Sequence, residues 1–186
     1  MAKALAVLGI DPDNSIRANF ALIVPVRVAE LLAWERWVHD PKRVTELHQM
    51  RIAAKRLRYV LEVTGPCFGK AADTARKRAR DLQDLLGEVH DCDVMLPRVQ
   101  AQIERLRADD ARAILLRAGE ADDLEPRLAA RAPNRAGYRG LEILAVHLRA
   151  RRALLYERFT EFWQAEASKG TWAALQHELD RRFSSR

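Results

Sequence analysis

The chain has 186 residues, of which 48% are hydrophobic and 31% are charged, a composition that excludes a disordered chain. Its length is enough for one domain, or for two small helical halves, with a substantial core. The net charge is +6, and the only cysteines, Cys67 and Cys92, exclude a disulfide framework or zinc-finger spacing and indicate a reducing compartment.

The N-terminal region lacks the features of a targeting segment. A short apolar run over the first ten residues is followed by Asp11-Pro12-Asp13-Asn14 instead of a small-residue cleavage site. The next apolar run, residues 20–28, contains Pro25 and Arg27 and is too short to cross a bilayer. We therefore expect a cytoplasmic protein with no membrane association, in which residues 1–14 form a flexible tail.

The remaining chain has helical periodicity, and no segment alternates as a strand does. Ser15 predicts the N-terminal cap of a first helix, and Asp40-Pro41 predicts the end of that helix. Gly65-Pro66 predicts the end of the second helix. The clearest later break is the Arg131–Gly137 segment. We expect helices at about residues 15–38, 43–63, 71–89, 91–106, 114–128, 138–166 and 171–183. The prediction is an all-α fold, an antiparallel bundle of about six or seven helices in a single domain over residues 1–186.

The second predicted helix has one basic and one apolar face. At about 100° per residue, His48, Arg51, Lys55 and Arg58 fall within a sector of about 80°. The opposite side is apolar and comprises Leu47, Met50, Ala54, Leu57 and Leu61. Residues 42–80 contain eleven Lys and Arg against three acids, a net charge of +8 that exceeds the surplus of the whole chain. Such a concentration of charge attracts polyanions, which include phosphate polymers, nucleic acids and anionic lipid.

The third predicted helix shows the same division of faces. Its polar side brings Arg76, Arg80, Gln83 and Gly87 close together. Antiparallel packing through a short connection would place the basic sides of both helices along one groove. Gly87 costs a helix about 1 kcal/mol relative to alanine, which indicates that something approaches the backbone there.

The long helix predicted at 138–166 carries Arg152 on its apolar line, and Arg149 lies on the flank. A buried guanidinium without a partner is too costly, so Arg152 must meet an acid or an anionic ligand. Asp91, Asp93 or a bound phosphate would serve.

Two motifs stand out, and together they cover about 50 residues. The first is His48-x-x-Arg51-x-x-x-Lys55-Arg56-Leu57-Arg58-Tyr59, and the second is Leu82-Gln83-Asp84-Leu85-Leu86-Gly87-Glu88-Val89-His90-Asp91-Cys92-Asp93-Val94. In composition, order and separation they resemble the conserved-histidine α-helical domain family, known as CHAD. This resemblance implies an all-helical bundle that binds inorganic polyphosphate in a basic groove, without known catalysis of its own. We expect no cofactor and no metal.

The resemblance also implies which residues bind the polymer. The anion-facing residues would be His48, Arg51, Lys55 and Arg58, and the neighbouring helix would contribute Arg76, Lys77 and Arg80. We add Arg56, Arg149 and Arg152 as further candidates. Members of the family usually have two related halves, each with its own basic helix, whereas this chain has one clear copy. Either the second half is reduced to the helix with Arg149, Arg151 and Arg152, or two chains pair as a homodimer to complete the groove.

Two alternative functions remain open at this stage. Nucleic-acid binding would use the same charge, although few aromatic residues and no standard recognition motif accompany it. A metal-dependent phosphohydrolase would use His90 and Asp91, but further ligands at a recognisable spacing are missing. We expect Asp91 and Asp93 to cap the following helix and to pair with arginines, and Tyr59 and Trp34 to pack in the core.

Overall fold

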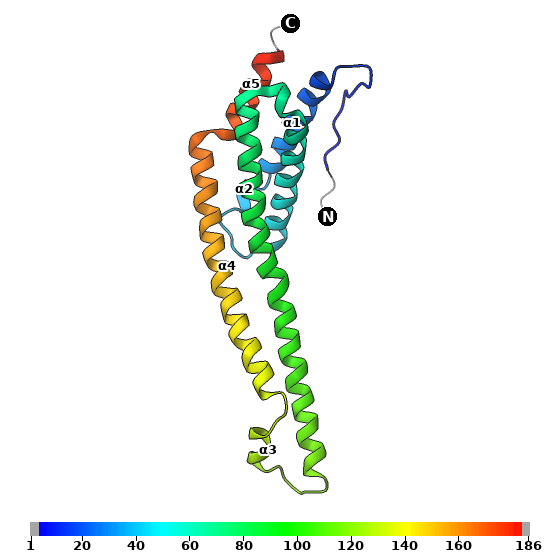
Figure 1. Ribbon diagram of the computed structural model, residues 1–186, viewed down its shortest axis with the longest axis vertical. Helices are drawn as coiled ribbons and strands as arrows, with labels where there is room; N and C mark the ends of the chain where they lie inside the picture. The colour runs from blue at the N-terminus through cyan, green and yellow to red at the C-terminus, as the bar shows by residue number, and fades with distance from the viewer. Residues whose placement is uncertain (1–3, 184–186) are drawn as a thin grey trace. The chain divides into compact units, whose positions relative to one another are not determined.

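The computed structural model describes residues 4–183, without the side chains of residues 65, 66, 182 and 183. The described chain is helical and contains no strand, which confirms the all-α prediction. In chain order the elements are α1 (Ile16–Leu32), the 3-10 helix η1 (Glu35–Trp37), α2 (Val44–Ala118), α3 (Pro126–Ala130), α4 (Arg135–Lys169) and α5 (Thr171–Phe183) (Figure 1). These are five α-helices within the described residues, fewer than the six or seven predicted, because α2 unites several expected segments.

The helix α2 consists of two arms that meet at Gly69. The backbone of Gly69 has φ 72° and ψ −156°, a conformation that glycine adopts at little cost and other residues avoid. We call residues 44–68 the first arm and residues 70–118 the second arm. The predicted stop at Gly65-Pro66 is therefore wrong. Thr64 and Phe68 are fully buried on either side of it, and their packing outweighs the unfavourable helix propensity of glycine and proline.

The second arm continues far beyond its predicted end. It runs without interruption through Asp91 and Asp93 to Ala118, where Gly119 follows with a left-handed φ of 59°. The predicted capping role of Asp91 and Asp93 is wrong, because both residues lie in the middle of a helix. The last helix, α5, has the predicted bounds, and α4 begins three residues earlier than expected, at Arg135.

The chain divides into two compact units. The first contains the described residues up to His90 and those from Leu155 onward, and the second is Asp91–Leu154. Both α2 and α4 contribute residues to each unit.

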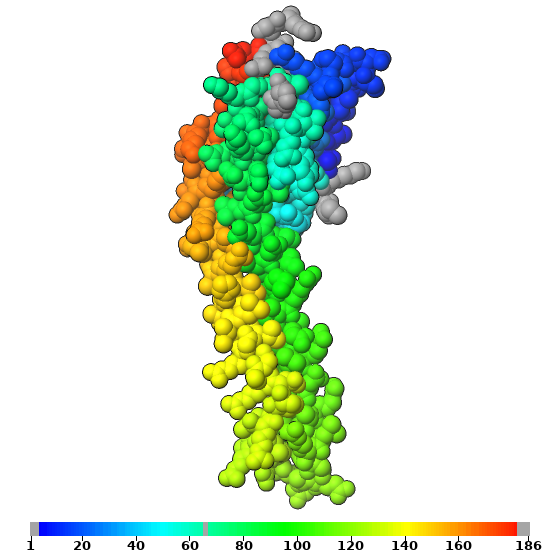
Figure 2. Space-filling model, in the orientation of Figure 1, coloured from blue at the N-terminus to red at the C-terminus, as the bar shows by residue number. Residues whose placement is uncertain are grey.

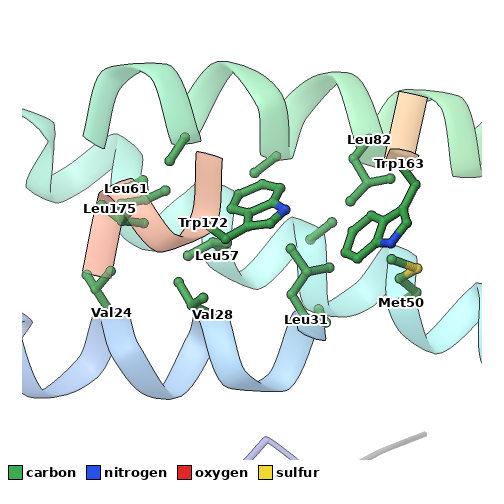
Figure 3. Close-up of a cluster of buried hydrophobic side chains, with 14 of the residues drawn as sticks. Val24, Val28, Leu31, Met50, Leu57, Leu61, Leu82, Trp163, Trp172 and Leu175 are labelled. Atoms are coloured by element: carbon green, nitrogen blue, oxygen red, sulfur yellow. The ribbon is translucent and has the colours of Figure 1, made fainter. Parts of the chain in front are cut away.

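The core of the first unit lies between α1, the two arms of α2, the last part of α4, and α5. Figure 3 shows Val28 and Leu31 of α1 facing Leu57 of the first arm, with the Trp172 indole of α5 among them. The second arm contributes several small buried residues, which let the helices approach closely: Ala72, Ala75 and Ala79. Burying a leucine or valine side chain stabilises the fold by about 1.5–3 kcal/mol, so the apolar face of the first arm turns inward and its basic face turns outward.

The segment before α1 is held by hydrogen bonds to that helix. The backbone N–H of Leu5 donates to Glu30 Oε1 at 2.5 Å, and Arg27 Nη2 donates to the Leu5 carbonyl oxygen at 2.8 Å. Ser15 caps α1 as predicted, since its Oγ accepts from the Ala18 N–H at 3.1 Å. The helix ends at Leu32, earlier than predicted, and η1 follows it.

The second unit has a small core between α2 and α4. Its buried apolar residues are Val99, Ile103 and Ala145, with Leu96, Tyr138, Leu141 and Leu148 partly buried against them. Asp110, which is 4% exposed, accepts hydrogen bonds from the Asn134 backbone and side chain, both at 3.0 Å. Because the core of this unit is so small, much of the apolar surface of its helices stays outside it.

Candidate functional site

The side chains of His48, Arg51, Lys55 and Arg58, which we call the basic row, lie together on the first arm of α2. Lys55 is exposed and the other three are half-buried. The residues predicted on the opposite face are at most 2% exposed: Leu47, Met50, Ala54, Leu57 and Leu61. The predicted division of this helix into an apolar and a basic face is confirmed.

The second arm faces the basic row through two contacts. The imidazole of His90 stacks on His48 with ring centroids 4.1 Å apart, and Arg58 Nη1 donates to Gln83 Oε1 at 3.3 Å. These contacts establish antiparallel packing of the two arms, as predicted, and their register places Arg51 level with residues 87–90. The space-filling view shows the cyan first arm and the blue-green part of the second arm in contact on one face (Figure 2).

Gly87 lies in the stretch of the second arm that is level with Arg51. A Cβ atom built on Gly87 would have no neighbouring protein atom within 4 Å, apart from its own helix backbone. There is therefore open space on the side of Gly87 to which a Cβ atom would point.

Unsatisfied polar atoms gather at this site. Seven buried side-chain nitrogen and oxygen atoms of the described residues have no hydrogen-bond partner, and four of them are here: His48 Nδ1, Arg51 Nε, Arg58 Nε and His90 Nδ1. Arg58 Nε lies 3.0 Å from Glu62 Oε1, an ion pair that lacks hydrogen-bond alignment. Each such atom typically costs about 1–3 kcal/mol. A cluster of them is typical of a site whose polar groups bind water or a ligand.

Arg51 and Lys55 have no acidic partner among the described residues, in contrast to most cations of this region. The pKa of His48 is lowered from its ordinary value of 6.5 by burial and by the proximity of His90 and Arg51. His48 is therefore neutral at pH 7, and the charge of the row there comes from Arg51, Lys55 and Arg58.

Tyr59 lies beside two members of the basic row. Its side chain is 47% exposed, so the predicted packing role is wrong. Lys55 Nζ is 5.6 Å and Arg58 Cζ is 5.0 Å from the centre of its ring, which places both cations in cation–π contact with it. This ring holds the two cations in place without neutralising them. Trp34 packs against the core, as predicted.

Besides Arg58, which lies beside Glu62, four predicted binding residues in the first unit have acidic neighbours. Arg76 and Lys77 pair with Asp73 at 2.8 and 2.9 Å, and their hydrogen bonds lower the pKa of the Asp73 carboxyl. Arg80 lies 3.7 Å from Asp84, and Arg56 lies 3.9 Å from the buried Glu30 of α1. Because Glu30 belongs to α1, Arg56 points toward that helix and away from the basic row.

The remaining predicted binding residues, Arg149 and Arg152, belong to the second unit. Arg152 Nε donates to Asp93 Oδ1 at 2.5 Å, and the side chains of this pair are only 17% and 10% exposed. The expectation that Arg152 meets an acid is confirmed, and the acid is Asp93. Arg149 is exposed and lines a cavity of about 520 Å³ together with Arg107 and Glu142.

The proposed metal ligands of the phosphohydrolase alternative lie next to each other on the second arm. His90 stacks on His48, while Asp91 is exposed. The described part of the chain contains no cluster of three or more His, Cys, Asp or Glu that would hold a metal ion.

A family model of the CHAD domain matches residues 26–186. The chain belongs to the CHAD domain family. The match includes the basic row, both arms of α2 and everything that follows, so the resemblance extends well beyond the two motifs. Comparison with curated proteins and with solved structures gave no match. None of the described helices of this CHAD domain combines the length and the apolar character that crossing a membrane requires.

Proposed function

We propose that this CHAD domain binds inorganic polyphosphate through the basic row and does not act on it chemically. The observation that carries the proposal is the state of Arg51 and Lys55. Both are cations without an acidic partner in the described chain, and Arg51 Nε is buried and unsatisfied next to the unsatisfied imidazole nitrogens of His48 and His90. A polyanion supplies both the negative charge and the hydrogen-bond acceptors that this surface lacks.

The row suits a linear polymer of phosphoryl groups. Its ten-residue span from His48 to Arg58 is about 15 Å of helix, so several successive groups of the polymer contact it at once. The guanidinium groups of Arg51 and Arg58 provide planar forks for phosphoryl oxygens, and Lys55 provides a point charge. Binding is then multivalent, so the affinity increases with chain length and decreases with salt concentration.

The surroundings of Tyr59 favour a phosphate polymer over a nucleic acid. Single-stranded nucleic acids gain much of their affinity from bases that stack on aromatic rings. Lys55 and Arg58 both lie within 6 Å of the Tyr59 ring, which restricts access of a base to it. We also propose a cytoplasmic location, with which the absence of a disulfide at Cys67 and Cys92 is consistent.

A competition titration tests the choice of polymer. Fluorescently labelled polyphosphate bound to the protein is displaced with unlabelled polyphosphate, single-stranded DNA or RNA of equal total charge. We expect displacement by polyphosphate at a concentration at least about ten times lower than by either nucleic acid. Stronger displacement by DNA or RNA would instead establish a nucleic-acid-binding protein.

A phosphate-release assay tests the absence of catalysis. The protein is incubated with polyphosphate or a nucleoside triphosphate in the presence of Mg²⁺ or Mn²⁺. We expect no release above the protein-free control. Release that disappears in Asp91→Ala would contradict the non-catalytic proposal and would favour the phosphohydrolase alternative.

A further inference from the structure

The helix α4 has a second apolar face that no described element covers. Ile143, Val146 and Leu154 are 67%, 62% and 49% exposed, and Ala150 lies between them at the same angle around the helix. The opposite face supplies Ala145 to the core of the second unit, with Leu141 and Leu148 partly buried beside it. A helix that is apolar on two sides, with a partner on only one, indicates a protein interaction surface.

Charged residues of opposite sign extend this exposed face at its two ends. Arg139 precedes Ile143 by one turn, and Glu157 and Glu161 follow Leu154. At about 100° per residue, all of them fall with the apolar residues within a sector of about 80°. Their side chains are exposed, and no ion pair joins any of the three to another described residue. This placement uses α4 alone, which is one uninterrupted helix from Arg135 to Lys169 (Figure 1).

We propose that this face binds the same face of a second copy of the chain, with the two α4 helices antiparallel. We call the face, made of Arg139, Ile143, Val146, Ala150, Leu154, Glu157 and Glu161, the α4 stripe. An antiparallel register with its two-fold axis near residue 148 places Arg139 opposite Glu157 and Val146 opposite Ala150. Each of these pairs then occurs twice, as a symmetric dimer requires.

The order of charges along the stripe selects this partner and this direction. The stripe is basic at its N-terminal end, apolar in the middle and acidic at its C-terminal end, so it is complementary to a reversed copy of itself. A parallel pair would instead place Arg139 beside Arg139 and Glu157 beside Glu157, and such like-charge contacts are unfavourable. The steps from Arg139 to Glu157 are three or four residues long, as in the seam of a coiled coil, and Ala150 near the axis allows close approach.

The first experiment measures the mass of the full chain in solution by sedimentation equilibrium, without polyphosphate. We expect a dimer that Val146→Asp weakens by at least about 100-fold in dissociation constant, because it places two carboxylates beside the two-fold axis in the apolar centre. The matched control is Leu116→Asp, which changes a residue of the same unit that is 78% exposed and lies outside the stripe. A wild-type protein that stays monomeric, or a dimer that Leu116→Asp weakens equally, would overturn the proposal.

A charge exchange tests the antiparallel direction with variants that leave all apolar residues intact. We expect Arg139→Glu and Glu157→Arg each to weaken the dimer by about 10-fold, and the double variant to restore it to nearly the wild-type dissociation constant. A double variant that is weaker than either single variant would exclude the proposed register. None of these measurements involves the basic row, so the dimer proposal and the proposed polyphosphate binding succeed or fail independently.

Discussion

Removal of the Arg51 guanidinium should weaken polyphosphate binding without weakening the fold. A hydrogen bond to a charged group contributes about 1.5–3 kcal/mol, so Arg51→Ala should reduce the affinity by about 10- to 150-fold. Its Nε is buried and makes no hydrogen bond in the folded protein. The substitution removes that unsatisfied group, so we expect the free energy of unfolding to stay the same or to rise by up to about 1 kcal/mol.

The salt dependence of the affinity gives a second, independent measure of how many cations contact the polymer. The row contains three permanent charges, Arg51, Lys55 and Arg58. If each releases the counterions of one phosphate, log K should change with log salt with a slope of about −2.1 to −2.7. That slope corresponds to a loss of about 20- to 40-fold in affinity between 50 and 200 mM salt. Arg51→Ala should make the slope less negative by about 0.7–0.9, whereas Arg51→Lys should keep the slope and lose only the affinity of the planar fork.

The assay is fluorescence anisotropy with labelled polyphosphate at several salt concentrations, alongside urea unfolding of each variant. The matched control is Arg56→Ala, on the same arm but paired with Glu30 of α1, whose side chain is 7% exposed. This variant should keep the wild-type slope and lose stability, because Glu30 loses an ion partner. Wild-type affinity and slope in Arg51→Ala, or a larger effect of Arg56→Ala on binding, would exclude Arg51 as a contact of the polymer.

Three further predictions concern the protonation of His48, the open space at Gly87 and the buried ion pair of Arg152 with Asp93. Because the pKa of His48 in the folded protein lies below 6.5, the unfolded chain takes up its proton first; the stability is intact above pH 6.5 and declines as the pH falls below it. Urea unfolding should show a smaller decline in His48→Gln, and an equal decline would contradict this assignment. Gly87→Ala should stabilise the helix by up to about 1 kcal/mol in the same assay, whereas Gly87→Glu, level with Arg51, should weaken polyphosphate binding by about 10-fold or more by anisotropy; unchanged affinity would place the ligand elsewhere. Arg152→Ala should cost about 3 kcal/mol of stability because Asp93 is left buried and unpaired, and should keep the affinity; a loss of affinity at unchanged stability would return Arg152 to the binding site.

Local signals predicted much of the fold. The cap at Ser15 and the bounds of α5 follow from residue type alone. The helix break at Gly65-Pro66 failed because it depends on tertiary structure: the buried side chains of Thr64 and Phe68 keep the arm helical. The break falls instead at Gly69, which has a positive φ. Both Gly65 and Gly69 could adopt this conformation, so the residue types alone do not identify the glycine at which the helix breaks.

The residues that share one face of the first arm were predictable from the sequence, but the contacts between the two arms were only partly predictable. Periodicity alone placed the basic row on one face. The acidic partners on the second arm were harder to predict, because Asp84, the neighbour of Arg80, lies beyond the basic segment of residues 42–80. A spacing of four residues predicts Asp84 as the partner of Arg80 and Asp73 as the partner of Lys77, which leaves fewer unpaired cations on this arm. The stack of His90 on His48 depends on the register of the two arms and has no signal in the sequence.

The most direct test of the central claim observes the Arg51 side chain itself. Arginine Nε–H signals are recorded by ¹H–¹⁵N NMR during a titration with polyphosphate, and the Arg51 signal is assigned by its loss in Arg51→Lys. We predict that the Arg51 signal shifts at the concentration at which polyphosphate binds, while the Arg152 signal, held by Asp93, stays in place. Saturating polyphosphate that leaves the Arg51 signal unmoved would contradict the account.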